Sequence, residues 1–238
     1  MLWKRRIKSV LLAWIKENGV FYDAGYDMTE KIFVIGDIHG CQAHLERMFE
    51  ILPINSNDRL IFIGDYIDRG PDSEGVVSMV ESISHRYPQT VCLMGNHEQM
   101  LLDFLSGEEP SLFLYNGGKT TLESYGCNDV EYAKAYFPDN HLTFYHNLLL
   151  YYETEDYIFV HAGLRPNIPL KEQNSTDLLW IRDEFYASRF TFPKRVIFGH
   201  TPFSEPMVRK DKIGIDTGAV YGNKLTCLEL PDMKFYQV

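Results

Sequence analysis

Six short apolar runs recur along this chain of 238 residues, and a polar motif follows each of them directly. The runs are three or four residues long and rich in β-branched and aromatic residues, which is typical of buried strands. They are Ile32–Ile35, Leu60–Ile63, Val91–Met94, Tyr157–Val160, Arg195–Phe198 and Ile213–Ile215. A chain built this way is predicted to form an α/β fold around buried strands.

Helical patterns separate the first three strands. Apolar residues from Leu45 to Leu52 recur at helical spacing before Pro53 ends the pattern. A second helix opens at Pro71 and presents an apolar face from Val76 to Tyr87. The order strand, helix, strand, helix, strand predicts parallel βαβ units. Ligands of such sheets bind beyond the carboxyl ends of the strands, so the six motifs should meet at one edge.

The second half of the chain is richer in strand signals. Leu148–Tyr152 and Tyr157–Val160 flank the polar stretch Glu-Thr-Glu-Asp, which predicts a hairpin. Residues 100–145 are predicted to be helical and irregular, with a turn at Asn116-Gly117-Gly118. This stretch carries no chemistry of its own in our interpretation, and its expected role is to wall or cover the site.

The motifs that follow the strands share one chemical character. They contribute carboxylate, imidazole and amide groups without thiolates, from Asp37, His39, Asp65, Asn96, His161 and His200. This donor set suits manganese, iron or zinc better than calcium, magnesium or copper(I). Six ligands exceed what one catalytic ion needs, so two ions that share a carboxylate, roughly 3.5–4 Å apart, fit the set better.

Each of these residues alone has a simpler explanation. A single His or Asp after a strand is more often a turn former or a polar group satisfied by its neighbours. Taken together the six are hard to explain in that way, because packing does not require a polar residue at the end of every buried strand.

Charge and cysteine content limit the partners. The chain has 23 Lys and Arg against 33 Asp and Glu, a formal net charge of −10, so it lacks the basic field that drives nonspecific nucleic-acid binding. No apolar run approaches the roughly 20 residues of a membrane helix, so stable membrane insertion is not expected.

The four cysteines form no C-x-x-C pair, which disfavours a structural zinc site or disulfides and predicts a cytoplasmic location. A monomer is the expected state.

The N-terminus, residues 1–30, is predicted to be an amphipathic helix and an extension that precede one domain over residues 31–238. Trp3, Ile7, Leu11 and Trp14 recur at helical spacing, which favours a helix docked on the domain. The alternative is a basic anchor on an anionic membrane, because residues 1–16 carry five positive charges and no acid.

Three long motifs identify a family resemblance. Gly-Asp-Ile-His-Gly, Gly-Asp-Tyr-Ile-Asp-Arg-Gly and Gly-Asn-His-Glu, followed by His-Ala-Gly and Gly-His-Thr, resemble the phosphoprotein phosphatases among the calcineurin-like metallophosphoesterases, and the compact chain is most similar to their bacterial and phage members. The resemblance spans about residues 31 to 220. It implies two stacked mixed β-sheets flanked by helices, in the order αββα, with two metal ions at one sheet edge.

The resemblance also implies roles for individual residues. The first ion would bind Asp37, His39 and Asp65, and the second would bind Asp65, Asn96, His161 and His200, with Asp65 as the bridge. Two divalent ions, manganese before iron or zinc, would generate a bridging hydroxide that attacks phosphorus in line.

The remaining roles concern the substrate phosphate and its leaving group. By resemblance, His97 is the general acid, and Asp68 fixes its tautomer. Arg69 binds the phosphate together with Asn96 and His97. Arg182 is predicted to be the second phosphate-binding arginine. The alternative interpretation is that Arg182 forms a salt bridge at the surface.

Several activities remain open for such a site. Some relatives that cut diesters carry Gly-His-x-His, but here Pro202 occupies the last position, which disfavours a nuclease or phosphodiesterase. The retained Asp68 favours a phosphomonoesterase, and we predict a serine/threonine protein phosphatase acting on phosphorylated protein or a small phosphoester. The alternative is a dinucleoside polyphosphate hydrolase, for example of diadenosine tetraphosphate. A non-catalytic binding module would be expected to lack some ligands, whereas all six are present.

Overall fold

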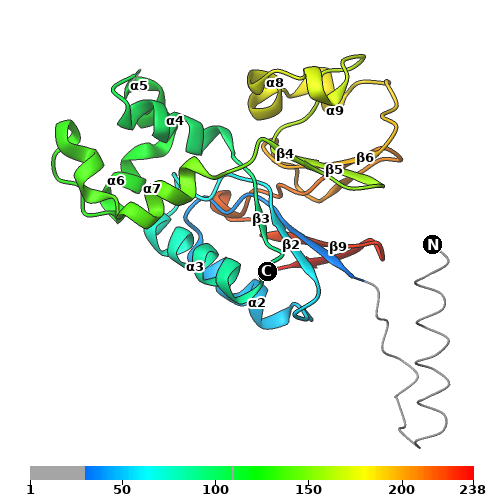
Figure 1. Cartoon of the computed structure of the whole chain (residues 1–238), viewed down its shortest axis with the longest axis horizontal. Helices are drawn as coiled ribbons and strands as arrows, with labels where there is room; N and C mark the ends of the chain where they lie inside the picture. Colours follow the sequence, from blue (N-terminus) through cyan, green and yellow to red (C-terminus); the bar gives the residue numbers. More distant parts are fainter. Residues whose placement is uncertain (1–29, 109) are drawn as a thin grey trace, which may run out of the picture. The chain divides into compact units, whose positions relative to one another are not determined.

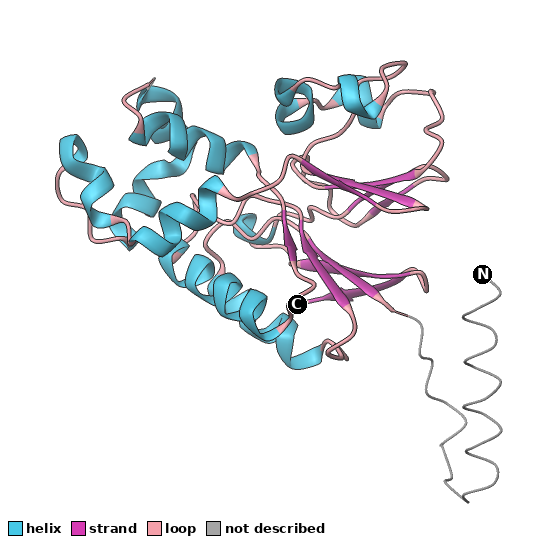
Figure 2. Ribbon diagram, in the orientation of Figure 1, coloured by secondary structure: helices cyan, strands magenta, loops and turns pink. Residues whose placement is uncertain are grey.

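The computed structural model describes residues 30–108 and 110–238, and its centre is formed by two five-stranded sheets (Figures 1 and 2). Sheet 1 has the strand order β10-β9-β1-β2-β3. Its three parallel strands are β1 (Ile32–Ile35), β2 (Arg59–Phe62) and β3 (Val91–Cys92). The antiparallel hairpin of β9 (Thr226–Leu230) and β10 (Lys234–Gln237) extends the sheet beyond β1.

Sheet 2 has the strand order β4-β5-β6-β8-β7. The parallel strands β5 (Tyr157–Val160), β6 (Arg195–Phe198) and β8 (Lys212–Gly214) form its middle. The antiparallel strands β4 (Tyr151–Glu153) and β7 (Met207–Val208) form its edges. The pairing of β4 with β5 confirms the hairpin predicted around residue 155, with a shorter first strand.

Apolar side chains from both sheets pack together between them. Val34, Ile61 and Leu228 of sheet 1 share one buried cluster with Phe159 and Ile197 of sheet 2. Alternate residues of a strand point to opposite faces, so the neighbours of Val34 in β1 belong to the cluster on the other side of the sheet. Strands buried on both faces read as continuous apolar runs, which is why they were visible in the sequence.

Helices cover the outer face of each sheet (Figure 2). On sheet 1 these are α2 (Gln42–Ile51) and α3 (Ser73–Arg86), whose apolar faces join the core under β1 and β2. Asp72 caps α3 by accepting a hydrogen bond from the Gly75 amide at 2.8 Å. On sheet 2, α8 (Ser175–Trp180) and α9 (Asp183–Tyr186) pack against β5 and β6. This arrangement confirms the predicted α/β fold with two mixed sheets flanked by helices.

A helical segment follows β3, as predicted for residues 100–145, and is drawn mostly in green in Figure 1. Its elements are α4 (Asn96–Leu105), α5 (Pro110–Phe113), the π-helical turn η1 (Leu114–Gly118), α6 (Lys119–Ser124), the 3₁₀ segment η2 (Val130–Tyr136) and α7 (Asp139–His146). The predicted turn at residues 116–118 lies inside η1, where Gly117 has a φ of 104°.

The fold also differs from the sequence prediction in its details. β3 ends at Cys92, because Leu93 forms only an isolated bridge with Leu149. The strands β7, β9 and β10 were not predicted, although β9 lies beside β1 in sheet 1. The predicted amphipathic helix falls within residues 1–29, outside the described residues, so the division near residue 30 stays a prediction. Within residues 30–108 and 110–238, no helix combines the length and apolarity needed to cross a membrane.

Candidate metal centre

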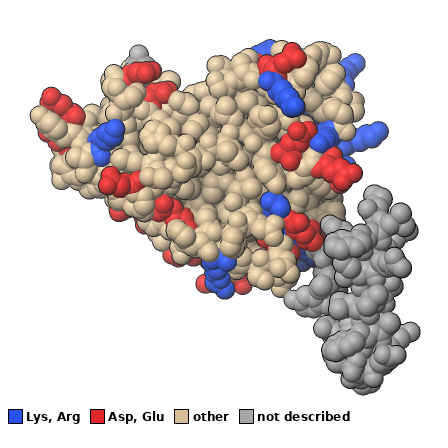
Figure 3. Space-filling view, viewed as in Figure 1, with Lys and Arg blue, Asp and Glu red and all other residues tan. Residues whose placement is uncertain are grey.

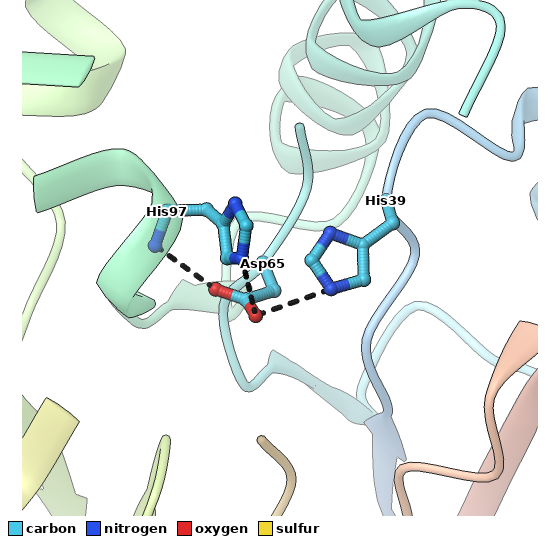
Figure 4. A group of neighbouring side chains, drawn as sticks. All are labelled: His39, Asp65 and His97. Carbon is cyan, nitrogen blue, oxygen red and sulfur yellow. Dashed lines mark hydrogen bonds and ion pairs between the residues drawn. The ribbon is translucent and has the colours of Figure 1, made fainter. Parts of the chain in front are cut away.

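The six predicted ligands come together at the carboxyl ends of the parallel strands. Asp37 and His39 follow β1, Asp65 follows β2, and the other three residues follow β3, β5 and β6. All six are at most 5% exposed. Two groups have ligand atoms that lie within 4.8 Å of one another, and Asp65 belongs to both. The first is His39, Asp65 and His97, drawn in Figure 4, and the second is Asp65, His161 and His200.

The first group differs in one member from the prediction, because it includes His97 in place of Asp37. His39 Nε2 is 3.3 Å from Asp65 Oδ2, whereas His97 Nε2 is 4.0 Å from the same oxygen. His39 Nδ1 donates to the carbonyl of Ile67 at 2.8 Å, so the ring presents the lone pair of Nε2, which is the candidate ligand atom. Asp37 lies beside the second group, where its Oδ2 accepts a hydrogen bond from the His200 amide at 2.9 Å.

In the second group, acceptor atoms face one another. His161 Nδ1 donates to the carbonyl of Ile63 at 2.9 Å, so its Nε2 presents a lone pair in the neutral ring. That lone pair is 3.4 Å from Asp65 Oδ1 and 3.0 Å from Asn96 Oδ1, which are acceptors themselves. His200 Nδ1 lies 2.8 Å from the same Asn96 oxygen. The lone pairs of His161 Nε2, Asp65 Oδ1 and Asn96 Oδ1 repel each other unless a cation lies among them, so this arrangement fits a metal ion.

Two buried atoms without a partner support the same fit. Asp37 Oδ1 and His200 Nε2 have no hydrogen-bond partner, although buried polar atoms are nearly always paired. Both are ordinary ligand atoms, and the whole donor set contains nitrogen and oxygen, as manganese, iron and zinc prefer. The residues therefore fit divalent cations, and the identity of the metal stays open.

The pKa values of the buried groups follow from burial and from their neighbours. Burial lowers the pKa of His161, and burial together with His161 lowers the pKa of His200 to about 2, so both rings are neutral and able to act as ligands. Burial raises the pKa of Asp65, but His161, His97 and His39 outweigh it and hold the net value well below the usual range. Burial and the nearby acids Asp216 and Asp65 raise the pKa of Asp37. Crowded carboxylates of this kind favour a bound cation.

The backbone is strained where the ligands are held. His39, Asp65, Asp68, Arg69 and His200 all have φ between 46° and 71°, a region that residues other than glycine seldom adopt. Strain of this kind is retained where the surrounding structure enforces it, and it clusters at functional sites.

Two glycines allow the carboxylates to approach the chain closely. A Cβ atom at Gly95 would lie 2.1 Å from Asp65 Oδ1, and one at Gly199 would lie 2.0 Å from Asp37 Oδ1. Any side chain at these positions would displace the carboxylates, so the glycines that precede Asn96 and His200 are required by the site.

The sequence pattern did not point to Glu98, although its carboxylate bonds the backbone next to two candidate ligands. It is fully buried, and its carboxylate accepts hydrogen bonds at 2.9 Å from the amides of Asp65, Tyr66 and Gly95. Burial and Asp65 raise the pKa of Glu98 to about 8, while these amides act in the opposite direction. The residue fixes the loop after β2 against the start of α4, which positions Asp65 and Asn96.

His97, the predicted general acid, is paired with Asp68 as predicted. His97 Nδ1 donates to Asp68 Oδ2 at 2.6 Å, and both side chains are buried. The Thr121 hydroxyl donates to the other oxygen of Asp68, and it accepts from the Asp68 amide at 2.9 Å. Thr121 comes from α6, in the segment that we expected to lack chemistry. That expectation was wrong, because the segment supplies a residue that positions Asp68.

Removal of the Thr121 hydroxyl tests this role. Thr121→Val keeps the shape but leaves one Asp68 oxygen unpaired, so we expect a loss of about 1–3 kcal/mol in the free energy of unfolding and a lower kcat. Urea unfolding and steady-state kinetics measure the two effects. Thr120→Val is the matched control, because the Thr120 hydroxyl donates only to the nearby Gly117 carbonyl. Equal behaviour of the two variants would contradict the role of Thr121.

Both predicted phosphate-binding arginines border the metal ligands. Arg69 Nη1 donates to His39 Nε2 at 2.7 Å, and its backbone amide donates to Gly117 at 3.3 Å. Arg182 is exposed and donates to the His200 carbonyl at 3.0 Å and to the Thr201 hydroxyl at 3.3 Å. The two guanidinium groups therefore lie beside different ligands, where both could bind phosphate oxygens.

Comparison with known proteins agrees with this geometry. The family model for calcineurin-like phosphoesterases matches residues 30–230. A bis(5'-nucleosyl)-tetraphosphatase PrpE (asymmetrical) from Oceanobacillus iheyensis is 30% identical over 238 aligned positions, which cover 87% of this chain and 92% of that protein. A relative with the same name from Anoxybacillus flavithermus is 29% identical and covers 86% of this chain and 92% of its own length.

Solved structures show the same fold. A structure described as a putative diadenosine tetraphosphatase superimposes with a TM-score of 0.70 at 24% identity, over 89% of this chain and 94% of that one. A cold-active protein-tyrosine phosphatase from a Shewanella species reaches a TM-score of 0.62 at 15% identity, over 87% and 80% of the two chains. The family match, the fold and the ligand groups together show that this chain belongs to the calcineurin-like phosphoesterases, a family of metal-dependent hydrolases.

Proposed function

We propose that this protein hydrolyses dinucleoside polyphosphates, with diadenosine tetraphosphate as the representative substrate. The observation that carries the proposal is the similarity, over most of both chains, to relatives named as bis(5'-nucleosyl)-tetraphosphatases. It favours the alternative from the sequence over the protein phosphatase that Asp68 had suggested. Asp68 does not decide between the two substrates, because its carboxylate bonds His97 and Thr121 and not the part of a substrate that distinguishes a peptide from a nucleoside.

The chain supplies a site suited to a polyphosphate. Asp37, His39, Asp65, Asn96, His161 and His200 would hold two divalent cations, which supply Lewis acidity to phosphate oxygens and acidify water. Arg69 and Arg182 border different ligands, so they could bind successive phosphate groups of one substrate molecule. A polyphosphate carries several negative charges, and two separate guanidinium groups match it better than one.

His97 is proposed to hold the proton for the leaving group at Nε2, because Nδ1 is engaged by Asp68 at 2.6 Å. This pair also favours a second candidate function, the hydrolysis of phosphomonoesters such as phosphothreonine in a peptide. The alkoxide that leaves from such a substrate is a strong base and needs a proton more than a nucleotide does.

A direct comparison of substrates tests the proposed function. The protein is depleted of metal by chelation, manganese is restored, and kcat/KM is measured for diadenosine tetraphosphate and for a phosphothreonine peptide. We expect a preference for the dinucleotide of at least ~100-fold, about 2.7 kcal/mol of differential transition-state binding. Chromatography should show ATP and AMP as the products. A preference for the peptide would overturn the proposal and support the second candidate.

A further inference from the structure

Tyr221 is an exposed aromatic residue beside one of the phosphate-binding arginines. Its side chain is 63% exposed, so it contributes little to the core. The guanidinium carbon of Arg69 lies 5.8 Å from the centre of the Tyr221 ring. Arg69 also contacts the metal ligand His39, so the ring lies one residue away from the candidate metal centre.

A short fixed turn presents this ring. Tyr221 ends the 3₁₀ turn η4 (Ala219–Tyr221), which lies between Gly218 with a φ of 69° and Gly222 with a φ of 84°. The Tyr221 amide donates to the Gly218 carbonyl at 2.9 Å, and the Gly218 amide donates to the buried carboxylate of Asp216 at 2.9 Å. These bonds fix the backbone from which the ring projects, so the turn need not rearrange when the ring contacts a flat ligand.

Pro202 extends the same surface. A Cβ atom built on Gly218 would lie 3.4 Å from Tyr221 Cδ2 and 3.8 Å from Pro202 Cβ, so both side chains flank this glycine. Pro202 is exposed and follows the ligand His200 by two residues. The rim of the site therefore combines an aromatic ring, a proline and a guanidinium group, and bases commonly stack on aromatic rings and arginine planes.

We infer that Tyr221 stacks on a nucleobase of the substrate and so selects nucleotides over phosphoesters that carry no base. The inference rests on the proposed function and names the residue that would read the nucleoside. Base stacking tolerates any nucleobase, because every base has a flat π face, so Tyr221 should distinguish nucleotides from other phosphates more than one base from another.

The test compares Tyr221→Leu with Tyr221→Phe. We expect Tyr221→Leu to lower kcat/KM for diadenosine tetraphosphate about tenfold, mainly through KM, while 4-nitrophenyl phosphate changes by less than about twofold. Tyr221→Phe should keep the wild-type values, because stacking needs the ring and not the hydroxyl. Tyr132→Leu is the matched control, since Tyr132 is also 63% exposed but belongs to η2.

A second readout uses inhibition of 4-nitrophenyl phosphate hydrolysis. In Tyr221→Leu the inhibition constant of ATP should rise about tenfold, while that of tripolyphosphate should stay unchanged. If the wild type does not hydrolyse diadenosine tetraphosphate, the proposed function fails. If the wild type hydrolyses it and Tyr221→Leu matches the wild type in both assays, the role of Tyr221 alone is refuted.

Discussion

Replacement of Asp65 by asparagine should abolish hydrolysis, with a fall in kcat/KM of at least ~1,000-fold. Asp65 is the residue that belongs to both ligand groups, and its two oxygens face different histidines. Oδ1 is 3.4 Å from His161 and Oδ2 is 3.3 Å from His39. Asparagine offers one oxygen, carries no charge and replaces the second oxygen with a donor, so it cannot join the two groups.

Metal analysis makes this prediction independent of activity. We expect Asp65→Asn to bind fewer ions per chain after dialysis against manganese, as measured by atomic emission. Asp58→Asn is the matched control, because Asp58 is also buried but, within residues 30–108 and 110–238, accepts from the amides of Lys31 and Asn55 and lies in neither ligand group. Circular dichroism checks that both variants fold. Normal metal content and activity in Asp65→Asn would show that Asp65 does not bridge two ions.

The second large effect concerns His97. We expect His97→Asn to lower kcat by about 10²- to 10⁴-fold for phenyl phosphate, the range typical of a lost general acid. The loss should shrink for 4-nitrophenyl phosphate, whose leaving group needs no proton, and it should also be small for diadenosine tetraphosphate, which releases a nucleotide. The physical reason is the pair formed by His97 Nδ1 and Asp68, which leaves Nε2 to hold a proton.

Metal content distinguishes a general-acid role of His97 from a metal-ligand role, which the geometry also allows. His97 belongs to the first ligand group, so a ligand role would make His97→Asn lose metal. A general acid would leave metal content normal. His141→Asn is the matched control, because His141 is a buried histidine that bonds Tyr125 and Ser78 instead. An equal loss of kcat for all leaving groups, or a loss of metal, would contradict the proton-donor role.

Charges of both signs are mixed on the surface. On the face drawn in Figure 3, Lys and Arg side chains are interspersed with Asp and Glu. The net charge of −10 gives no long-range attraction for a nucleic-acid backbone. Arg69 and Arg182 are instead local cations beside the candidate ligands His39 and His200.

Much of the fold was predictable because its signals are local. A parallel strand buried on both faces is a continuous apolar run, and six such runs correspond to strands β1, β2, β3, β5, β6 and β8. Helix α3 was predictable from Asp72 at its start and its apolar spacing. Strand β9 was not predicted, because its place beside β1 depends on pairs such as Ile32 with Leu230, which are far apart in the sequence.

Some features of the candidate site could likewise be predicted from the sequence, whereas others depend on contacts between distant segments. The short motifs at the strand ends contain the six candidate ligands, and the geometry of parallel strands brings them to one edge, although the structure groups His97 in place of Asp37 with His39 and Asp65. The contacts that position those ligands come from distant segments. Thr121 bonds Asp68 across 53 positions, and Glu98 bonds the Asp65 amide across 33, so no local pattern could reveal either contact.

The sequence by itself therefore predicted the donor set of a metal centre, because residue types and their order along the chain indicate such a set. Only the tertiary structure showed that Thr121 bonds Asp68, the partner of His97, and that Tyr221 lies beside Arg69. Arg69, Pro202 and Tyr221 meet at that rim through the folding of three separate segments. Contacts between distant segments of this kind exist only once the chain has folded.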